Sequence, residues 1–395
     1  MTIADEFAVS EAIGPPVEPG AATSAIFLGT LSLLMIGVMP ALLGALADAG
    51  RLTDAGIGQC ATLESLAIGL CAGLCGAVLK PVHLRWIAGG AVLALGLLDL
   101  ASIPLSNGAL MIARTLAGLP EGVLLWLTVG MIARSQTPER VAGIFFTSIV
   151  SAQLLLALAF VYVIPHFGSE GGFAALALTA FTGIVAAFFA PRSYAPLVKD
   201  EKTSGMPPLR GWVALLATLI YTAAAGAVSV YLQPMAHEAG LTADVARTAL
   251  WISLAGQVAG GLMATVLAGR VHYFTVFIAS SFVFIGSWAL FTVHPPAWLF
   301  LFANATFGFV LVLIGPFLVP MTIEADPTRR TAMQSGATQL LAGALGPLLA
   351  SFVVDDREVF GVIYLGVALI VGGLLLMALL HVMALRERKS SARAN

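Results

Sequence analysis

Arg114 and Glu121 lie within the otherwise apolar segment 111–126, MIARTLAGLPEGVLLW, and are its two ionisable side chains. In a helix, residues seven apart lie about two turns apart on the same face. A charged side chain at the centre of a bilayer costs at least ~2.5 kcal/mol, so such groups usually face a cavity or a partner. We predict that both side chains point into the protein. Proton binding is the chemistry they could do, and the alternative is that Arg114 only links neighbouring helices.

A second acid, Glu64, lies about nine residues from the start of the apolar segment 55–79. At 1.5 Å per residue of helix, this places Glu64 about 13 Å below the end of the segment. A carboxyl group can exchange protons when burial disfavours its charge and a nearby arginine favours it. We therefore predict Glu121 and Glu64 as proton-coupling residues, with Arg114 as their partner. A fixed ion pair with Arg114 is the alternative for Glu64. Asp99 lies near the outer end of segment 86–104, where we expect water to reach it, and we predict a structural role.

The second half of the chain has no lysine, arginine, aspartate or glutamate well inside an apolar segment, and offers neutral polar groups instead. Buried amides and hydroxyls in a membrane usually face the protein interior. We predict that substrate is recognised by these groups, together with two residues of the first half; hydrogen bonds between helices, or packing for the tryptophan, are the alternative. The predicted substrate-binding residues are Trp126, Gln153, Tyr221, Tyr231, Gln257, Asn304 and Gln339.

The composition identifies the helices that must position these residues. The chain has 395 residues, of which 59% are hydrophobic and 10% charged, and its mean hydropathy is +0.97. Soluble domains have about 25% charged residues, so the sequence predicts an all-α membrane protein. Twelve segments are long enough to cross a bilayer: 23–46, 55–79, 86–104, 108–133, 141–164, 172–190, 211–234, 246–268, 273–293, 297–322, 331–353 and 360–384.

The distribution of basic residues predicts the orientation. With the N-terminus in the cytoplasm, fifteen lysines and arginines fall on the cytoplasmic side and only Arg51, Arg247 and Arg357 on the outer side. Cytoplasmic loops carry the excess of basic residues, so we expect both termini in the cytoplasm. The first twenty residues contain no basic residue and therefore do not resemble a signal peptide.

The two halves of the chain repeat with a constant offset in residue number. Leu52-Thr53 corresponds to Leu241-Thr242, and Pro138 corresponds to Pro327 at the same offset. The charged, proline-rich stretch 191–210 separates the halves. We predict a cytoplasmic tail (1–22), a six-helix bundle (23–190), a cytoplasmic linker (191–210), a second six-helix bundle (211–385) and a second tail (386–395). Transporters built from such repeats bind substrate near the bilayer midplane.

This organisation resembles the major facilitator superfamily over about residues 23–385. Arg114 followed by Gly118 is similar to the helix-4 signature of that superfamily, and Gly118-Leu-Pro-Glu-Gly122 with Pro138-Glu-Arg140 is similar to its arabinose-efflux-permease branch of drug:proton antiporters. That branch typically has histidine where this chain has Glu121, another titratable residue. Two departures are the absence of aspartate from the loop 76–85 and of a Gly-Pro pair from 147–160.

These observations predict a proton-coupled secondary transporter of the inner membrane that moves a small organic molecule by alternating access, with efflux slightly favoured. The alternatives are a proton symporter for uptake of a small organic acid, an uncoupled facilitator, and a receptor that binds without transport. We expect a monomer in the lipid bilayer, with protons and a neutral or moderately lipophilic substrate as partners, and no nucleic acid. A monocarboxylate fits only if Arg114 faces the substrate cavity.

We predict no enzymatic activity, cofactor or metal. The sequence has no phosphate-binding loop or nucleophile elbow. Cys60, Cys71 and Cys75 all fall in one apolar segment, which offers too few ligands for a metal.

Overall fold

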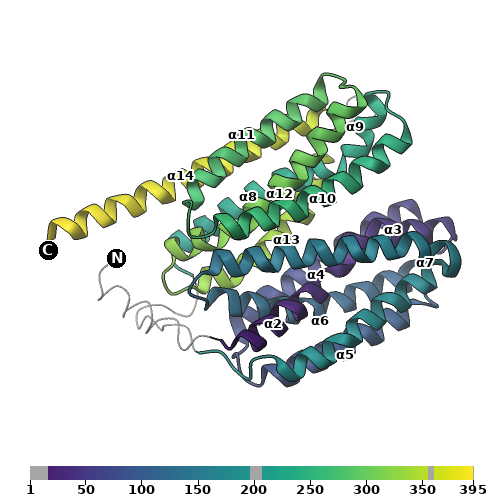
Figure 1. The fold of residues 1–395 in the computed structure, drawn as a ribbon, viewed down its shortest axis with the longest axis horizontal. Helices are drawn as coiled ribbons and strands as arrows, with labels where there is room; N and C mark the ends of the chain where they lie inside the picture. The colour runs from purple at the N-terminus through teal and green to yellow at the C-terminus, as the bar shows by residue number, and fades with distance from the viewer. Residues whose placement is uncertain (1–16, 196–206, 355–359, 395) are drawn as a thin grey trace. The chain divides into compact units, whose positions relative to one another are not determined.

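The computed structural model describes residues 17–195, 207–354 and 360–394, and within these ranges it consists of helices and connecting turns without a β-strand. The predicted all-α class is confirmed (Figure 1). The predicted linker 191–210 and N-terminal tail 1–22 lie largely outside the described residues. The helices are α2 (Pro19–Ser32), α3 (Leu34–Asp48), α4 (Asp54–Val78), α5 (Leu84–Ser102), α6 (Asn107–Ala133), α7 (Pro138–Phe189), α8 (Leu209–Val230), α9 (Leu232–Glu238), α10 (Ala243–Leu267), α11 (Tyr273–Thr292), α12 (Ala297–Ala325), α13 (Arg330–Ala350) and α14 (Gly361–Ala394).

Ten of the described helical stretches are long and apolar enough to cross a membrane. α7 covers both predicted spans 141–164 and 172–190, because Gly168 interrupts it with a positive φ of 65° that suits glycine. α13 is not among the ten, since polar residues such as Gln334 and Gln339 lower its mean hydropathy. With α7 counted as two crossings and α13 included, the described helices correspond to the twelve predicted spans.

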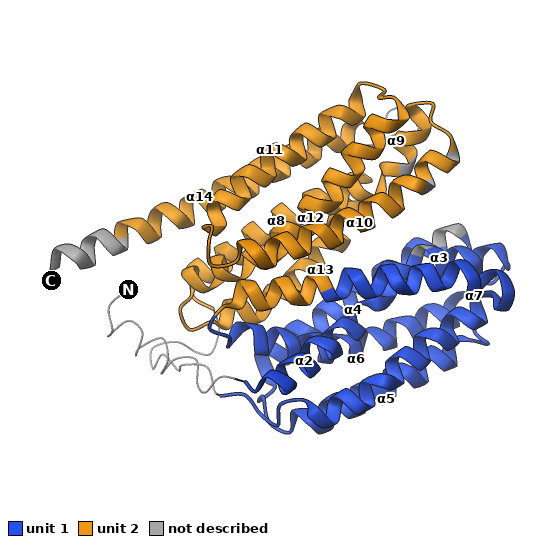
Figure 2. Cartoon of the chain, in the orientation of Figure 1, with its two compact units in different colours: residues 1–136, 148–198 blue, residues 137–147, 199–395 orange. Residues whose placement is uncertain are grey.

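The chain divides into two compact units (Figure 2). Unit 1 comprises Met1–Gln136 and Ser148–Val198, and unit 2 comprises Thr137–Thr147 and Lys199–Asn395. The first turns of α7 therefore belong to unit 2, where Gly261 and Gly143 allow α10 to approach them: a Cβ on Gly261 would lie 2.5 Å from Thr147 Oγ1.

In unit 1, α6 is the most buried of the membrane-length helices, and α4 packs closely along it. A Cβ on Gly118 would lie 2.8 Å from the carbonyl oxygen of Glu64, and one on Gly122 would lie 2.6 Å from that of Ile68. Two glycines one turn apart thus let the backbones of α4 and α6 touch. This contact fixes which residues of α4 lie opposite Arg114.

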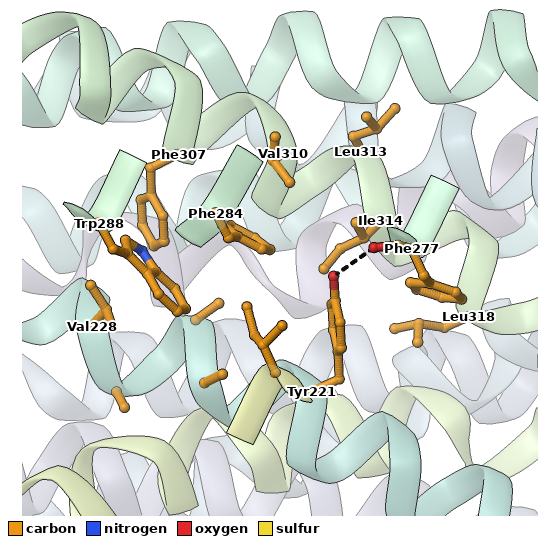
Figure 3. Close-up of a cluster of buried hydrophobic side chains, with 14 of the residues drawn as sticks. Tyr221, Val228, Phe277, Phe284, Trp288, Phe307, Val310, Leu313, Ile314 and Leu318 are labelled. Carbon is orange, nitrogen blue, oxygen red and sulfur yellow. Dashed lines mark hydrogen bonds between the residues drawn. The ribbon is translucent and has the colours of Figure 1, made fainter. Parts of the chain in front are cut away.

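In unit 2, α10 packs against α12 and α8 packs against α13. Its hydrophobic core contains a group of aromatic rings surrounded by aliphatic side chains (Figure 3). The Trp288 ring stacks on Phe284 with ring centroids 5.4 Å apart, and Phe307 lies 5.6 Å from Phe284. Ring packing therefore contributes to the interior of this unit, together with the aliphatic side chains around the rings.

The sequence repeat agrees with the positions at which corresponding helices of the two halves begin. Thr53 is the N-cap of α4, and its hydroxyl accepts a hydrogen bond from the Gly56 amide. Thr242, the counterpart of Thr53 in the second half, is the N-cap of α10. His83 and His272 likewise precede α5 and α11. Each pair of helices therefore starts at matching positions of the two halves.

Candidate functional site

The predicted charged residues of the first half form one buried cluster around Arg114. The guanidinium Nε donates to Glu64 Oε2 at 3.1 Å, and its Nη2 donates to Glu64 Oε1. Its Nη1 donates to Asp99 Oδ1 at 2.5 Å. Glu121 Oε1 lies 3.9 Å from Nη2, beyond hydrogen-bonding distance. All four side chains are at most 4% exposed, so the cluster is closed to solvent in this conformation.

Three helices position the cluster. Arg114 and Glu121 come from α6, and their spacing of two turns places them on the same face as predicted from the sequence. Glu64 comes from α4, which the glycines of α6 bring close. Asp99 comes from α5. The face of the guanidinium also lies 5.8 Å from the centre of the Phe173 ring, which covers it on the side of α7.

The four groups are not equally compensated. Arg114 makes a two-pronged contact with Glu64 and a single hydrogen bond with Asp99. Glu121 has only a long electrostatic contact, and its Oε2 is buried without a hydrogen-bond partner among the described residues. Three ionised carboxylates around one guanidinium would leave two uncompensated charges at bilayer depth. Protonation of Glu121 removes one of them at the position where the guanidinium compensates least.

A very small cavity, about 10 Å³, adjoins the two carboxylates that Arg114 holds less firmly, Asp99 and Glu121. Apolar side chains, among them Leu31 and Met35, line the rest of it. A polar cavity of about this size can hold a single water.

The structure corrects the prediction for Asp99. We expected water to reach this residue near the outer end of its span, yet it is 3% exposed and bound to Arg114. Asp99 continues the buried stripe of Val92, Leu95 and Gly96 on α5, at helical spacing. The sequence signal was this periodicity, which places Asp99 on the packed face of the helix at any depth.

In unit 1, the two predicted substrate-binding residues are buried. Gln153 is 7% exposed and its Nε2 donates to the carbonyl oxygen of Leu33 at 2.7 Å. Leu33 is the break between α2 and α3, so Gln153 satisfies a backbone group that the break exposes. Trp126 is 3% exposed. The alternative of hydrogen bonds between helices thus describes the contact that Gln153 makes in this conformation.

In unit 2, three predicted substrate-binding residues have partners on their own or a neighbouring helix. The Tyr221 hydroxyl pairs with Ser281 Oγ at 2.9 Å inside the aromatic core (Figure 3). Asn304 Nδ2 donates to the Phe300 carbonyl, and Gln339 Nε2 lies 3.4 Å from the Ser335 carbonyl. Tyr231 and Gln257 are half-buried. The substrate-contact role of all seven residues stays a prediction.

Sequence reasoning missed a second polar group. The predicted span 297–322 ended before Glu324, but α12 continues to Ala325 and includes it. Glu324 Oε2 accepts a hydrogen bond from the Tyr273 hydroxyl and lies 4.0 Å from His381 Nδ1. An acid at the end of an apolar run is easily read as the end of the helix, and only packing brings Tyr273 and His381 to it.

The comparisons with known proteins agree with this architecture. Residues 22–351 match the family model described as Major Facilitator Superfamily. Among solved structures, the chain is similar to the human organic anion transporter MFSD10 (TETRAN), with 14% identity and a TM-score of 0.73 over 92% of this chain and 100% of that one. It is also similar to FucP, a transporter of the same superfamily in an outward conformation, with 12% identity and a TM-score of 0.72 over 92% and 99% of the two chains. No curated protein sequence matches the chain.

Proposed function

Because the chain belongs to the major facilitator superfamily, a family of secondary transporters, we propose that it couples the transport of a small organic molecule to the movement of protons. It is a multi-pass membrane protein with a small-molecule substrate and is not an enzyme. We also propose that the protein lies in the inner membrane, that both termini are cytoplasmic and that transport is coupled to protons. The observation that carries the coupling is the buried cluster of Glu64, Asp99, Glu121 and Arg114.

Glu121 is the proposed site of the exchangeable proton. It combines complete burial, a distance of 3.9 Å from Arg114 and an oxygen without a partner among the described residues. Glu64 is the proposed fixed partner of Arg114, since it receives two of the guanidinium hydrogen bonds. Removal of a proton from Glu121 adds a charge that the closed cluster does not compensate, and this favours a conformation in which water or Arg114 reaches it.

Proton binding and conformation are then linked. A group that is buried in one state and hydrated in another binds its proton with different affinity in the two states, and each tenfold difference is about 1.4 kcal/mol of bias between them. A substrate that binds one conformation better must therefore change the proton affinity, and protons must change the substrate affinity by the same factor. This reciprocity is what a proton-coupled carrier requires.

For the substrate, the cluster favours a neutral or moderately lipophilic molecule. Arg114 is fully buried and its hydrogen bonds go to carboxylates, so it offers no cation to an organic acid in this conformation. Efflux is slightly favoured because Gly118-Leu-Pro-Glu-Gly122 resembles the arabinose-efflux-permease branch. Uptake by proton symport, uncoupled facilitation and a non-transporting receptor are the alternatives that the experiment must separate.

The decisive variant is Glu121→Gln, which mimics the protonated carboxyl. A thermal-shift screen at two pH values first supplies a ligand, and its radiolabelled form is then used in proteoliposomes. We expect Glu121→Gln to abolish accumulation driven by a proton gradient, while exchange across liposomes without a gradient persists. Glu64→Gln should have a weaker effect on coupling, and Glu170→Gln, which changes an exposed acid, should behave as wild type.

The other outcomes identify the alternatives. If Glu121→Gln still concentrates the ligand at the wild-type rate, Glu121 is not the coupling site and Glu64 becomes the candidate. If the wild-type protein exchanges the ligand but never concentrates it, the chain is a facilitator. If it binds the ligand with no flux in either assay, the chain is a receptor.

A further inference from the structure

Three side chains that can ligate a metal meet in unit 2, where α11 begins and α12 ends. His272 immediately precedes α11, Glu324 is in the last turn of α12, and His381 is on α14. One ligand atom from each lies within 4.8 Å of the others. The three residues lie far apart in the sequence, so only the packing of the unit places them together.

We propose that His272, Glu324 and His381 form a binding site for a divalent transition-metal ion of the Zn²⁺ type. Two imidazoles and one carboxylate are a donor set that Zn²⁺ accepts with a fourth position left for water. A tetrahedral ion would hold the donor atoms roughly 3.4 Å apart, given metal–ligand distances near 2.1 Å. The side chains must therefore close by about an ångström, which the exposed His272 can do.

The surroundings of His381 indicate that its imidazole is available to an ion. Its Nδ1 is buried, has no hydrogen-bond partner among the described residues and lies 4.0 Å from Glu324 Oε2. The ring is held by Phe274, which stacks on it with centroids 4.9 Å apart and planes 21° apart. A buried, unpartnered nitrogen facing a carboxylate is costly, and a bound cation would satisfy both groups.

The neighbouring groups support the carboxylate and give access to it. The Tyr273 hydroxyl donates to Glu324 Oε2, as residues behind a metal ligand commonly do. A cavity of about 390 Å³ is lined by His272, Tyr273 and Glu324, and it also contains Glu139, so an ion can enter past a second acid. Arg270 is the cation in this lining, and it would weaken rather than prevent binding.

His272 is expected to be the weakest ligand. Its Nδ1 accepts a hydrogen bond from the Phe274 amide at 3.2 Å, which caps α11. A neutral imidazole carries one proton, so ligation through either nitrogen ends this bond. We therefore expect His272 to contribute less to the affinity than Glu324 and His381. An ion held there would join α11, α12 and α14, and would stabilise the folded unit in proportion to its occupancy.

The test uses the full-length protein, purified without a histidine tag and treated with chelator, with Cys60, Cys71 and Cys75 replaced by serine. Those replacements matter because Cys71 and Cys75 have sulfur atoms 3.9 Å apart and could themselves bind Zn²⁺. Titration calorimetry with Zn²⁺ should give one ion per chain, and Co²⁺ should give the absorption of tetrahedral coordination. His381→Ala and Glu324→Gln should each weaken binding at least tenfold, and Tyr273→Phe about tenfold.

The matched controls are His237→Ala and His166→Ala, which remove exposed histidines outside the cluster and should bind as the parent does. Should the buried-site variants fail to fold, His272→Ala at an exposed position still tests the site, with a smaller loss expected. The proposal is overturned if the parent shows no saturable binding, if His381→Ala and His272→Ala both bind like the parent, or if Co²⁺ is octahedral.

Discussion

Unit 1 and unit 2 use the same helical frame but fill its interior with opposite chemistry. α4 and α10 begin and end at positions related by the sequence repeat, and α5 and α11 start at related positions. When the same offset in residue number is applied, the four charged residues of unit 1 correspond to buried, uncharged residues of unit 2. Glu64, Asp99, Arg114 and Glu121 correspond in this way to Ser253, Trp288, Ala303 and Val310.

The difference shows that the frame does not require the charges. Replacement of a buried ion network by apolar residues of similar volume is often neutral or stabilising by about 1–4 kcal/mol. In unit 2, Trp288 and Val310 occupy two of these positions as part of its hydrophobic core (Figure 3). The shared helical frame therefore does not need the charged cluster of unit 1, which agrees with the proposed role of that cluster in proton coupling.

The largest expected effect comes from breaking the charge balance of unit 1. Arg114→Ala leaves three buried carboxylates without their cation, which should cost about 3–5 kcal/mol of the free energy of unfolding. Thermal and denaturant unfolding in detergent would measure it. The same arginine replacement combined with Glu64→Gln, Asp99→Asn and Glu121→Gln should recover much of the loss. If Arg114→Ala alone unfolds like wild type, the cluster is not compensated as the structure shows.

In unit 2, the matching experiment removes ring packing instead of charge. Trp288 is fully buried and stacks on Phe284, so Trp288→Ala should cost about 3–5 kcal/mol. The control is Trp298→Ala on α12, whose side chain is 69% exposed and should contribute little. Equal melting temperatures for the two variants would contradict the assignment of this core.

A smaller effect, on ligand affinity, is expected when the predicted substrate-binding residues of unit 2 are replaced. A lost hydrogen bond costs about 0.5–1.5 kcal/mol, so alanine at Tyr231, Gln257 or Asn304 should weaken binding of the screened ligand a few-fold to tenfold. Tyr364→Ala, at a tyrosine that is 71% exposed, should leave the affinity unchanged. If all three replacements bind like wild type, recognition uses other residues or shape alone.

The smallest effect is expected for the Tyr221 hydroxyl. Tyr221→Phe removes its bond with Ser281, but Ser281 Oγ keeps a second bond to the Phe277 carbonyl at 2.7 Å. The loss should therefore be at the lower end of about 0.5–1.5 kcal/mol, measured by thermal unfolding. Tyr364→Phe provides the baseline. A change in ligand affinity without a change in stability would instead favour the predicted substrate contact.

The sequence alone determined the class of the fold and the shared helix face of Arg114 and Glu121. Apolar segments of membrane length give helices wherever they occur, because backbone groups in a bilayer must pair within their own helix. The seven-residue spacing in α6 likewise places Arg114 and Glu121 on one face, since helical periodicity is local. Family membership followed from the same local patterns and from the helix-4 motif.

Tertiary structure alone decided which residues meet across helices. The pairing of Asp99 with Arg114 depends on how α5 packs against α6, and the partner of Gln153 is a carbonyl exposed by a break at Leu33. The meeting of His272, Glu324 and His381 depends on the start of α11, the end of α12 and the middle of α14 lying side by side. Contacts between distant segments follow from side-chain packing over the whole unit, and no local pattern in a single sequence encodes them.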